Sequence, residues 1–224
     1  AEVDLEVVLQ EVEEGPTVVP DEDDDGVKEG EKLPLKVKIG YAFGEVALYI
    51  AAGLQGFFLP TFLLEVAQLD AVLAGVVVLV GQAYDAVTDP IVGQLSDITV
   101  TKMGRRRPYM LAGALPLALV FFGSWLVPPV PMLLKAAYYL AFFLLIKTFY
   151  SIVAVPYSAL TPDLTEDYNE RTMLTMYRMM MAMMGSLISV VVHSVLVVQL
   201  EGEGGDVRLA YMLSMGAWSI VICG

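Results

Sequence analysis

The sequence predicts an all-α membrane protein, folded as a bundle of six transmembrane helices. Hydrophobic residues make up 57% of its 224 residues, and the mean hydropathy is +0.65. That is more apolar than a soluble domain of this length normally is. The apolar residues also form continuous blocks of roughly 20 residues or more, which is the length that a helix needs to cross a bilayer.

The formal net charge of -13 belongs mainly to the first part of the chain. Residues 1–32 hold thirteen acidic residues and two lysines, including an unbroken acidic run at 21–25. A segment with so much charge and so little apolar surface is typical of a disordered tail. We therefore expect a disordered acidic tail over 1–32 and a nearly neutral membrane bundle over 33–224.

Six apolar blocks give the expected helices: 39–66, 71–96, 108–127, 136–160, 172–200 and a last one from 207. Pro108 suits the first turn of the third helix, where its missing N–H is not needed. The proline-rich stretch 127–131 cannot continue that helix. The sixth block reaches residue 224 without a polar flank, so we expect the natural chain to continue beyond it.

The basic residues outside the helices gather on one side of the predicted bundle. They precede the first helix or lie in the loops after the second and fourth helices: Lys32, Lys36, Lys38, Lys102, Arg105, Arg106, Arg107 and Arg171. The loops of the other side carry only two bases. Because basic loops stay in the cytoplasm, we expect a cytoplasmic N-terminus in a multi-pass protein, with the plasma membrane as its location.

Two acidic residues in the second predicted helix are the main functional signal. Asp85 and Asp89 are four residues apart, so they share one helix face. Two carboxylates at bilayer depth are costly unless a proton or a cation neutralises them. A site for Na⁺ or H⁺ satisfies this need. The alternative is a fixed salt-bridge network with Lys or Arg from neighbouring helices, and the sequence leaves both open.

Helical depth predicts partners for these acids. Ser151 on the fourth helix lies near the level of Asp85, given the helical rise of about 1.5 Å per residue. Lys147, one turn away, either pairs with Asp85 or holds an anionic group of a substrate. Glu45 and Arg178 lie at similar depths from the cytoplasm. They form an interhelical salt bridge, or Arg178 lines a cavity where its planar fork suits phosphate or carboxylate.

Several motifs resemble known families. The stretch Gly93-Gln-Leu-Ser-Asp97 followed by Gly104-Arg-Arg-Arg107 resembles the loop signature of the major facilitator superfamily. The block Tyr84-Asp-Ala-Val-Thr-Asp-Pro90 is similar to the helix 2 motif of its glycoside–pentoside–hexuronide:cation symporters, as are Val155-Pro-Tyr-Ser-Ala-Leu160 and Tyr177-Arg178. The resemblance implies the N-terminal half of a major facilitator fold. It also implies a cytoplasmic gating loop that contains Gly93, Asp97, Gly104, Arg105, Arg106 and Arg107.

Within that group, residues 56–68 and 155–161 look more like the sodium-dependent lysophosphatidylcholine symporters. Two acids that the sugar symporters use for sugar or cation are replaced here by Val46 and Ala154. This difference argues against a melibiose-like sugar site and favours an amphiphilic substrate.

The resemblance also assigns residues to sites. It implies that the coupling cation is bound by Asp85, Asp89, Thr88 and Ser151, with Na⁺ as the metal of the two aspartates. Together with the charged residues found from helical depth, of which Lys147 has no counterpart in the family, it gives five residues expected in the substrate cavity: Tyr84, Lys147, Arg178, Glu45 and Tyr157.

Two functions from different classes follow. The first is a symporter, coupled to Na⁺ or H⁺, that moves a small or amphiphilic solute (a lysolipid or a sugar) by alternating access. Its partners are the lipid bilayer, the solute and the C-terminal half of the same transporter. The second is a non-transporting six-helix accessory subunit. Because the sequence has no phosphate loop, cysteine–histidine metal spacing or nucleophile elbow, we expect no enzyme, no cofactor beyond the coupling ion and no nucleic-acid partner.

Overall fold

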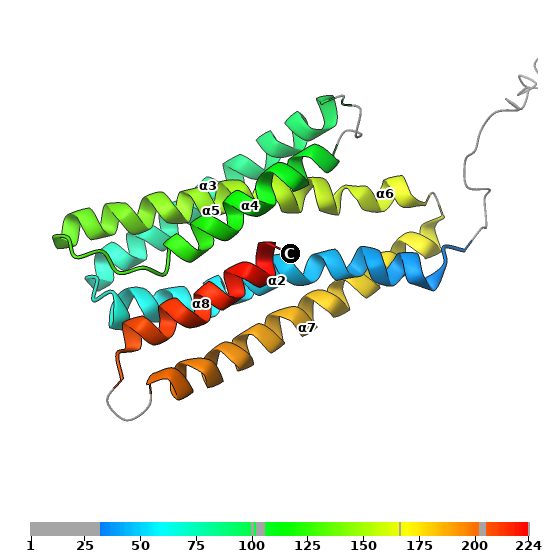
Figure 1. The fold of residues 1–224 in the computed structure, drawn as a ribbon. Helices are drawn as coiled ribbons and strands as arrows, with labels where there is room; N and C mark the ends of the chain where they lie inside the picture. The colour runs from blue at the N-terminus through cyan, green and yellow to red at the C-terminus, as the bar shows by residue number, and fades with distance from the viewer. Residues whose placement is uncertain (1–31, 100, 102–105, 166, 202–204, 224) are drawn as a thin grey trace, which may run out of the picture. The chain divides into compact units, whose positions relative to one another are not determined.

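The computed structural model describes residues 32–99, 101, 106–165, 167–201 and 205–223. These residues form helices and connecting turns, with no strand among them (Figure 1). The helices are α2 (Leu35–Thr61), which continues as the π-helical turn η1 (Phe62–Val66), α3 (Ala71–Ile98), α4 (Arg107–Gly123), α5 (Met132–Ser158), the short α6 (Leu160–Leu164), α7 (Tyr168–Glu201) and α8 (Val207–Cys223). The predicted all-α bundle is confirmed, with helices at all six predicted blocks. The tail expected over 1–32 lies, apart from Lys32, outside the described residues and stays a prediction.

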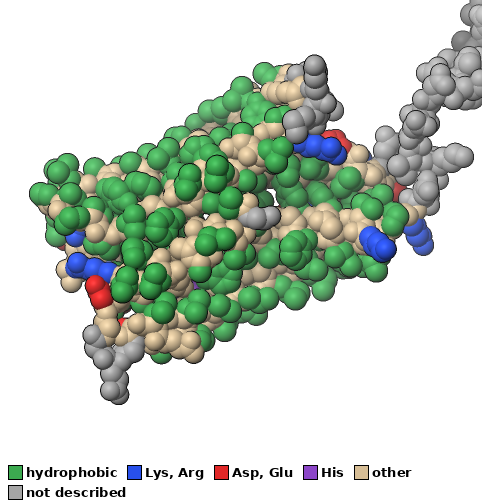
Figure 2. All heavy atoms as spheres, viewed as in Figure 1, with side chains coloured by type: hydrophobic (Ala, Val, Ile, Leu, Met, Phe, Trp, Pro, Cys, Tyr) green, Lys and Arg blue, Asp and Glu red, His purple; other side chains and the backbone are tan. Residues whose placement is uncertain are grey.

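The helices have the lengths and surfaces of membrane helices. Four segments are both long and apolar enough to cross a bilayer, namely Leu35–Val66, Ala71–Ile98, Met132–Leu164 and Tyr168–Glu201, while α4 and α8 are apolar but shorter. Leu, Val, Ile and Met side chains are exposed along them. Figure 2 shows these side chains covering the face in view, with the charged ones toward the helix ends. Such a continuous apolar surface fits lipid rather than water.

The six helices pack as two pairs that α4 and α8 join. Helix α2 packs along α7, and α3 packs along α5. Helix α4 contacts α5 and α8, and α8 in turn contacts α7 and α2. The pairs meet at one end of the bundle in an aromatic core, where Phe62 packs against Trp125, Tyr139 and Tyr211. The α3–α5 pair is the one that carries the predicted cation site.

The third predicted helix ends earlier than expected, within the error of such predictions, and the structure gives a physical reason. The third helix was expected to run to residue 127, but α4 ends at Gly123. The carbonyl of Gly123 accepts a hydrogen bond from the Tyr138 hydroxyl at 2.6 Å, and the carbonyl of Leu126 accepts one from Tyr139 at 3.0 Å. Because these tyrosines of α5 satisfy backbone groups that a longer helix would have bonded internally, the chain turns four residues early.

Close contact between α3 and α5 depends on Gly81. A Cβ atom at this position would overlap the ring of Phe143 on α5. Gly75, two turns earlier on α3, has no other heavy atom within 4 Å of the place where its Cβ would lie. The two glycines therefore lie on the same helix, but only Gly81 packs closely against a neighbouring helix.

We expect Gly81→Leu to destabilise the protein by about 1 to 3 kcal/mol, because the added side chain forces α3 away from Phe143. The matched variant Gly75→Leu should melt within a degree or two of the native protein. Thermal melting followed by tryptophan fluorescence checks both, and equal melting temperatures for the two variants would contradict this account of the packing.

Candidate functional site

Two polar pairs link α3 to α5, each with one residue on either helix. The ammonium of Lys147 donates to Oδ2 of Asp85 at 2.8 Å, and the hydroxyl of Ser151 donates to Oδ1 of Asp89 at 2.5 Å. On each helix the two residues are four apart, so they lie on one face, one turn above the other. The contact between Asp85 and Lys147 is the pairing that the sequence analysis offered as one of two alternatives.

The carboxylate of Asp85 is only partly hydrogen-bonded. Its second oxygen, Oδ1, is buried and has no hydrogen-bond partner among the described residues. Lys147 also donates to Oε1 of Gln82 at 3.1 Å. Ser151 is fully buried and is close enough to donate to the carbonyl of Lys147 as well, at 2.9 Å. The site therefore keeps an unpaired carboxylate oxygen, Oδ1 of Asp85.

The other predicted residues of α3 bond elsewhere. The Thr88 hydroxyl lies 3.2 Å from each of two backbone carbonyls of its own helix, those of Tyr84 and Asp85. The Tyr84 hydroxyl reaches α5, where it bonds the hydroxyl of Thr148 at 3.0 Å. No group of three or more His, Cys, Asp or Glu side chains arranged to hold a metal ion occurs in the described part of the chain. A cation here would need hydroxyl or carbonyl oxygens besides the two carboxylates.

Glu45 and Arg178 form a two-point ion pair between α2 and α7. The guanidinium donates to both carboxylate oxygens, at 2.9 and 3.1 Å, and only 7% of Glu45 is exposed. The predicted salt bridge between these residues is confirmed. Its geometry is the bidentate one that gives Arg–carboxylate pairs both strength and a fixed orientation.

Two tyrosines and a threonine complete this cluster. Tyr41 and Tyr157 stack with ring centres 5.1 Å apart, and the Arg178 guanidinium lies 5.7 and 5.3 Å from them. Each tyrosine hydroxyl donates to the backbone carbonyl of the other residue. Arg178 also donates to the Thr161 hydroxyl at 2.9 Å. Thr161 and Tyr41 were not predicted from the sequence, because neither carries a charge that would make it conspicuous in an apolar helix.

The predicted gating loop is described only in part. Arg106 pairs with Asp97 at 3.2 Å and with Asp163 at 2.7 Å, and it also donates to the carbonyl of Ala159. Arg107 begins α4 and is exposed, and Gly93 lies on α3 opposite Val155. The other two predicted residues, Gly104 and Arg105, lie outside the described residues. Asp163 was missed, although its place just after the fourth predicted helix puts it on the side of the basic loop.

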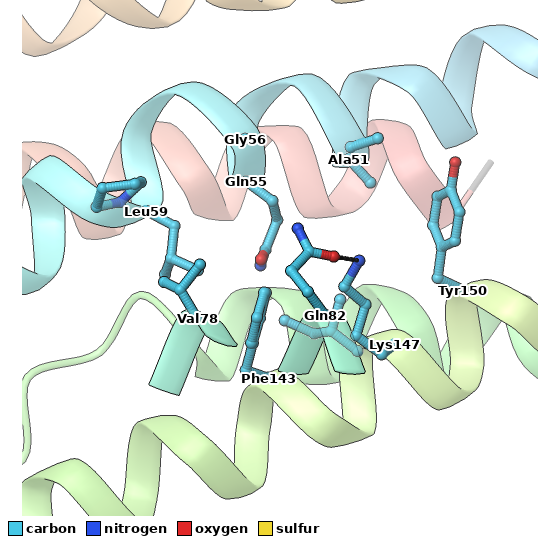
Figure 3. Close-up of a pocket in the computed structure, with 12 residues that line it drawn as sticks. Ala51, Gln55, Gly56, Leu59, Val78, Gln82, Phe143, Lys147 and Tyr150 are labelled. Atoms are coloured by element: carbon cyan, nitrogen blue, oxygen red, sulfur yellow. Dashed lines mark hydrogen bonds between the residues drawn. The ribbon is translucent and has the colours of Figure 1, made fainter. Parts of the chain in front are cut away.

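A pocket of about 280 Å³ opens between α2, α3 and α5, and Lys147 of the first polar pair lines it (Figure 3). Its polar lining comes from Gln55, Gln82, Lys147 and Tyr150, and the rest is apolar. Of the five residues predicted for the substrate cavity, Lys147 lines this pocket. The other four lie at the helix contacts given above, and their part in substrate binding stays a prediction.

Comparison with known proteins places this architecture in a family. A family model described as MFS/sugar transport protein matches residues 40–224. An uncharacterized symporter of Synechocystis is 39% identical over 84% of this chain and 37% of its own length. The zebrafish (Danio rerio) sodium-dependent lysophosphatidylcholine symporter 1-A is 39% identical over 71% of this chain and 30% of its own. A mouse (Mus musculus) sphingosine-1-phosphate transporter is 35% identical over 77% of this chain and 35% of its own length.

The chain spans about a third of the length of these curated relatives. The matched range, residues 40–224, still covers nearly all of the described bundle and includes the positions of the two aspartates, the loop motif and the cluster around Arg178. The sequence resemblance to the major facilitator superfamily is thereby confirmed. This chain is an integral, multi-pass membrane protein, and it belongs to the MFS/sugar transport protein family.

Proposed function

We propose that the protein works in a cation-coupled symporter and that the α3–α5 pairs bind the coupling cation. The observation that supports this most directly is the charge of the site. Lys147 neutralises Asp85, so Asp89 keeps one formal negative charge, and its hydrogen-bond partner among the described residues is the Ser151 hydroxyl. One monovalent cation, Na⁺ or H⁺, balances it. The relatives named as symporters, including a sodium-dependent one, favour the same reading.

The Asp89–Ser151 contact provides a simple way to take up the ion. The Ser151 hydroxyl donates a hydrogen bond to Asp89, and its oxygen keeps lone pairs that can coordinate a cation. Rotation about the Cβ–Oγ bond of Ser151 turns its hydrogen away from Asp89, so that the hydroxyl oxygen and the carboxylate can both face Na⁺. The ion then links α3 to α5 and stabilises one packing of this bundle. The bundle then rocks against the other half of the transporter. We place the transporter in the plasma membrane, with its N-terminus in the cytoplasm.

We propose a lysolipid or a sugar as the solute, with the lysolipid favoured. Two relatives are named for lysophosphatidylcholine and sphingosine-1-phosphate, while the family description names sugar. The bundle supplies an apolar pocket with a few polar groups next to the cation site, as binding of an amphiphilic molecule requires. A non-transporting accessory role is not favoured, since the relatives are named as transporters.

Direct binding of ²²Na⁺ to the purified protein tests the cation site without knowledge of the solute. We expect about one Na⁺ per chain and loss of at least 90% of the binding in Asp89→Asn, which removes the remaining charge. A fluorescent dye that reports proton uptake and release tests the H⁺ version on the same samples. Glu65→Gln removes an exposed carboxylate of η1 and is the matched control. If Asp89→Asn binds and exchanges both ions as the native protein does, the cation site is elsewhere.

A further inference from the structure

Gln55 of α2 is a buried side chain whose amide lacks partners. Only 8% of the residue is exposed, and neither its amide nitrogen nor its amide oxygen has a hydrogen-bond partner among the described residues. Burial of an amide without hydrogen bonds is unfavourable, so native proteins nearly always provide a partner. Gln55 lines the pocket, and Figure 3 shows its amide pointing into the space between α2 and the α3–α5 pair. A molecule that enters the pocket can therefore supply the missing hydrogen bonds.

The polar groups around Gln55 define the chemistry of that ligand. Gln82 extends into the same space from α3 (Figure 3). Its Oε1 accepts from Lys147, which leaves its NH₂ group as a donor. Lys147 is held by Asp85 at 2.8 Å, so the pair adds no net charge to the pocket. Gln55 itself offers one acceptor and two N–H donors. The pocket thus presents both donors and acceptors and is electrically neutral.

The remaining wall is apolar. It includes the ring of Phe143, which lies 5.7 Å below the Lys147 ammonium, together with Leu59, Val78 and Ile146. An anionic group would compete with Asp85 for Lys147 and would meet the Asp85 carboxylate nearby. A hydroxyl group both donates and accepts, carries no charge, and is attached to carbon atoms that pack on such a wall. The lining therefore matches a hydroxyl group better than a phosphate or a carboxylate.

We propose that this pocket binds a hydroxyl-bearing part of the transported solute and that Gln55 is the residue that recognises the hydroxyl. The proposal rests on the proposed symport function and names the chemical group that the symporter recognises. The hydroxyl comes either from the glycerol unit of a lysolipid or from a sugar ring. Both sources share the chemistry, and the experiment separates them.

The test measures binding of three tritiated probes to the protein in lipid nanodiscs: 1-acyl lysophosphatidylcholine, the same lipid with hydrogen in place of its glycerol hydroxyl, and melibiose. If glycerol is the source, we expect the native protein to bind the hydroxyl-bearing lipid at least tenfold more tightly than the deoxy lipid. In Gln55→Leu this preference should disappear. If a sugar is the source, melibiose binds the native protein, and Gln55→Leu weakens that binding at least tenfold.

Gln94→Leu is the matched control, since Gln94 is an exposed glutamine of α3, and it should behave as the native protein does. Gln55→Leu is expected to melt at a higher temperature than the native protein, because it removes an unpaired buried amide. A glutamine that is only structural would affect stability and leave the hydroxyl preference unchanged. That result overturns the proposal, and so does a native protein that binds neither lysolipid nor melibiose.

Binding of ²²Na⁺ separates this proposal from the proposed symport function. Gln55 belongs to α2 and makes no hydrogen bond to the Asp89–Ser151 pair in the described structure, so Gln55→Leu should bind Na⁺ as the native protein does. If Gln55→Leu keeps the native preference for the hydroxyl while Asp89→Asn still loses Na⁺ binding, only the proposal about the pocket is refuted. If Asp89→Asn binds Na⁺ as the native protein does, the proposed cation site is refuted instead.

Discussion

Replacement of Asp85 by asparagine is expected to abolish Na⁺-stimulated uptake, and addition of Lys147→Gln is expected to restore it. The native site holds two carboxylates and one ammonium, which leaves one negative charge for one cation. Asp85→Asn leaves one carboxylate and one ammonium, so the site is neutral without an ion. The double variant Asp85→Asn/Lys147→Gln again has one carboxylate. Uptake of lysophosphatidylcholine into proteoliposomes, with and without a Na⁺ gradient, measures the outcome.

The expected magnitudes make this test strict. In Asp85→Asn, Na⁺ stimulation should fall at least 100-fold, since Lys147 then occupies the position of the cation as a tethered positive charge. In the double variant it should return to within about tenfold of the native value, because the Asp89–Ser151 pair is intact. Melting curves and gel filtration verify that all variants fold. A double variant as inactive as Asp85→Asn would mean that Asp85 binds the cation directly, and the charge account would fail.

Lys147→Gln alone supplies an internal control for the same charge account. It leaves two carboxylates one turn apart with no fixed positive partner, which is unfavourable at bilayer depth. We expect a steeper dependence of uptake on Na⁺ concentration than in the native protein, as a second cation becomes necessary. An unchanged dependence would indicate that Lys147 does not share the site with the cation.

Much of the fold was predictable because a membrane restricts the choices. Continuous apolar blocks predicted the long helices, and four of them match α2 with η1, α3, α5 and α7 to within about four residues at each end, within the normal error of such predictions. The end of α4 was not predictable, because it depends on hydroxyl groups of Tyr138 and Tyr139 that arrive from another helix. Hydropathy along the chain carries no information on such a contact.

The candidate site was predictable only where charge is involved. Asp85, Lys147, Glu45 and Arg178 stand out in apolar helices, and counting depth along each helix offered both of their ion pairs as alternatives. The same count put Ser151 level with Asp85, whereas Ser151 bonds Asp89 in the structure. Gln55 carries no charge and has no motif around it. It becomes notable only when the structure shows that it is buried with an unpaired amide. Neutral polar residues inside a membrane protein therefore require the three-dimensional arrangement before a role can be inferred.

The largest loss of stability is expected from Glu45→Gln. This change leaves the Arg178 guanidinium buried between α2 and α7 without its counter-charge, while its bonds to Thr161 and to the backbone of Ser158 remain. Removal of one partner of a buried ion pair typically costs about 3 to 5 kcal/mol. We expect the melting temperature in detergent to fall by roughly 10 °C. Arg208→Met removes an exposed charge at the start of α8 and should have little effect, which makes it the matched control.

The double variant Glu45→Leu/Arg178→Met decides what the ion pair does. Apolar side chains of similar size commonly replace a buried ion pair without loss of stability, so the double variant should melt close to the native protein. If the pair serves only to hold α2 against α7, uptake of lysophosphatidylcholine should recover together with stability. If Arg178 also receives an anionic group of the solute, stability recovers but uptake does not. A double variant that stays as unstable as Glu45→Gln would contradict the charge explanation, because the loss would then come from side-chain packing on Tyr41 and Tyr157.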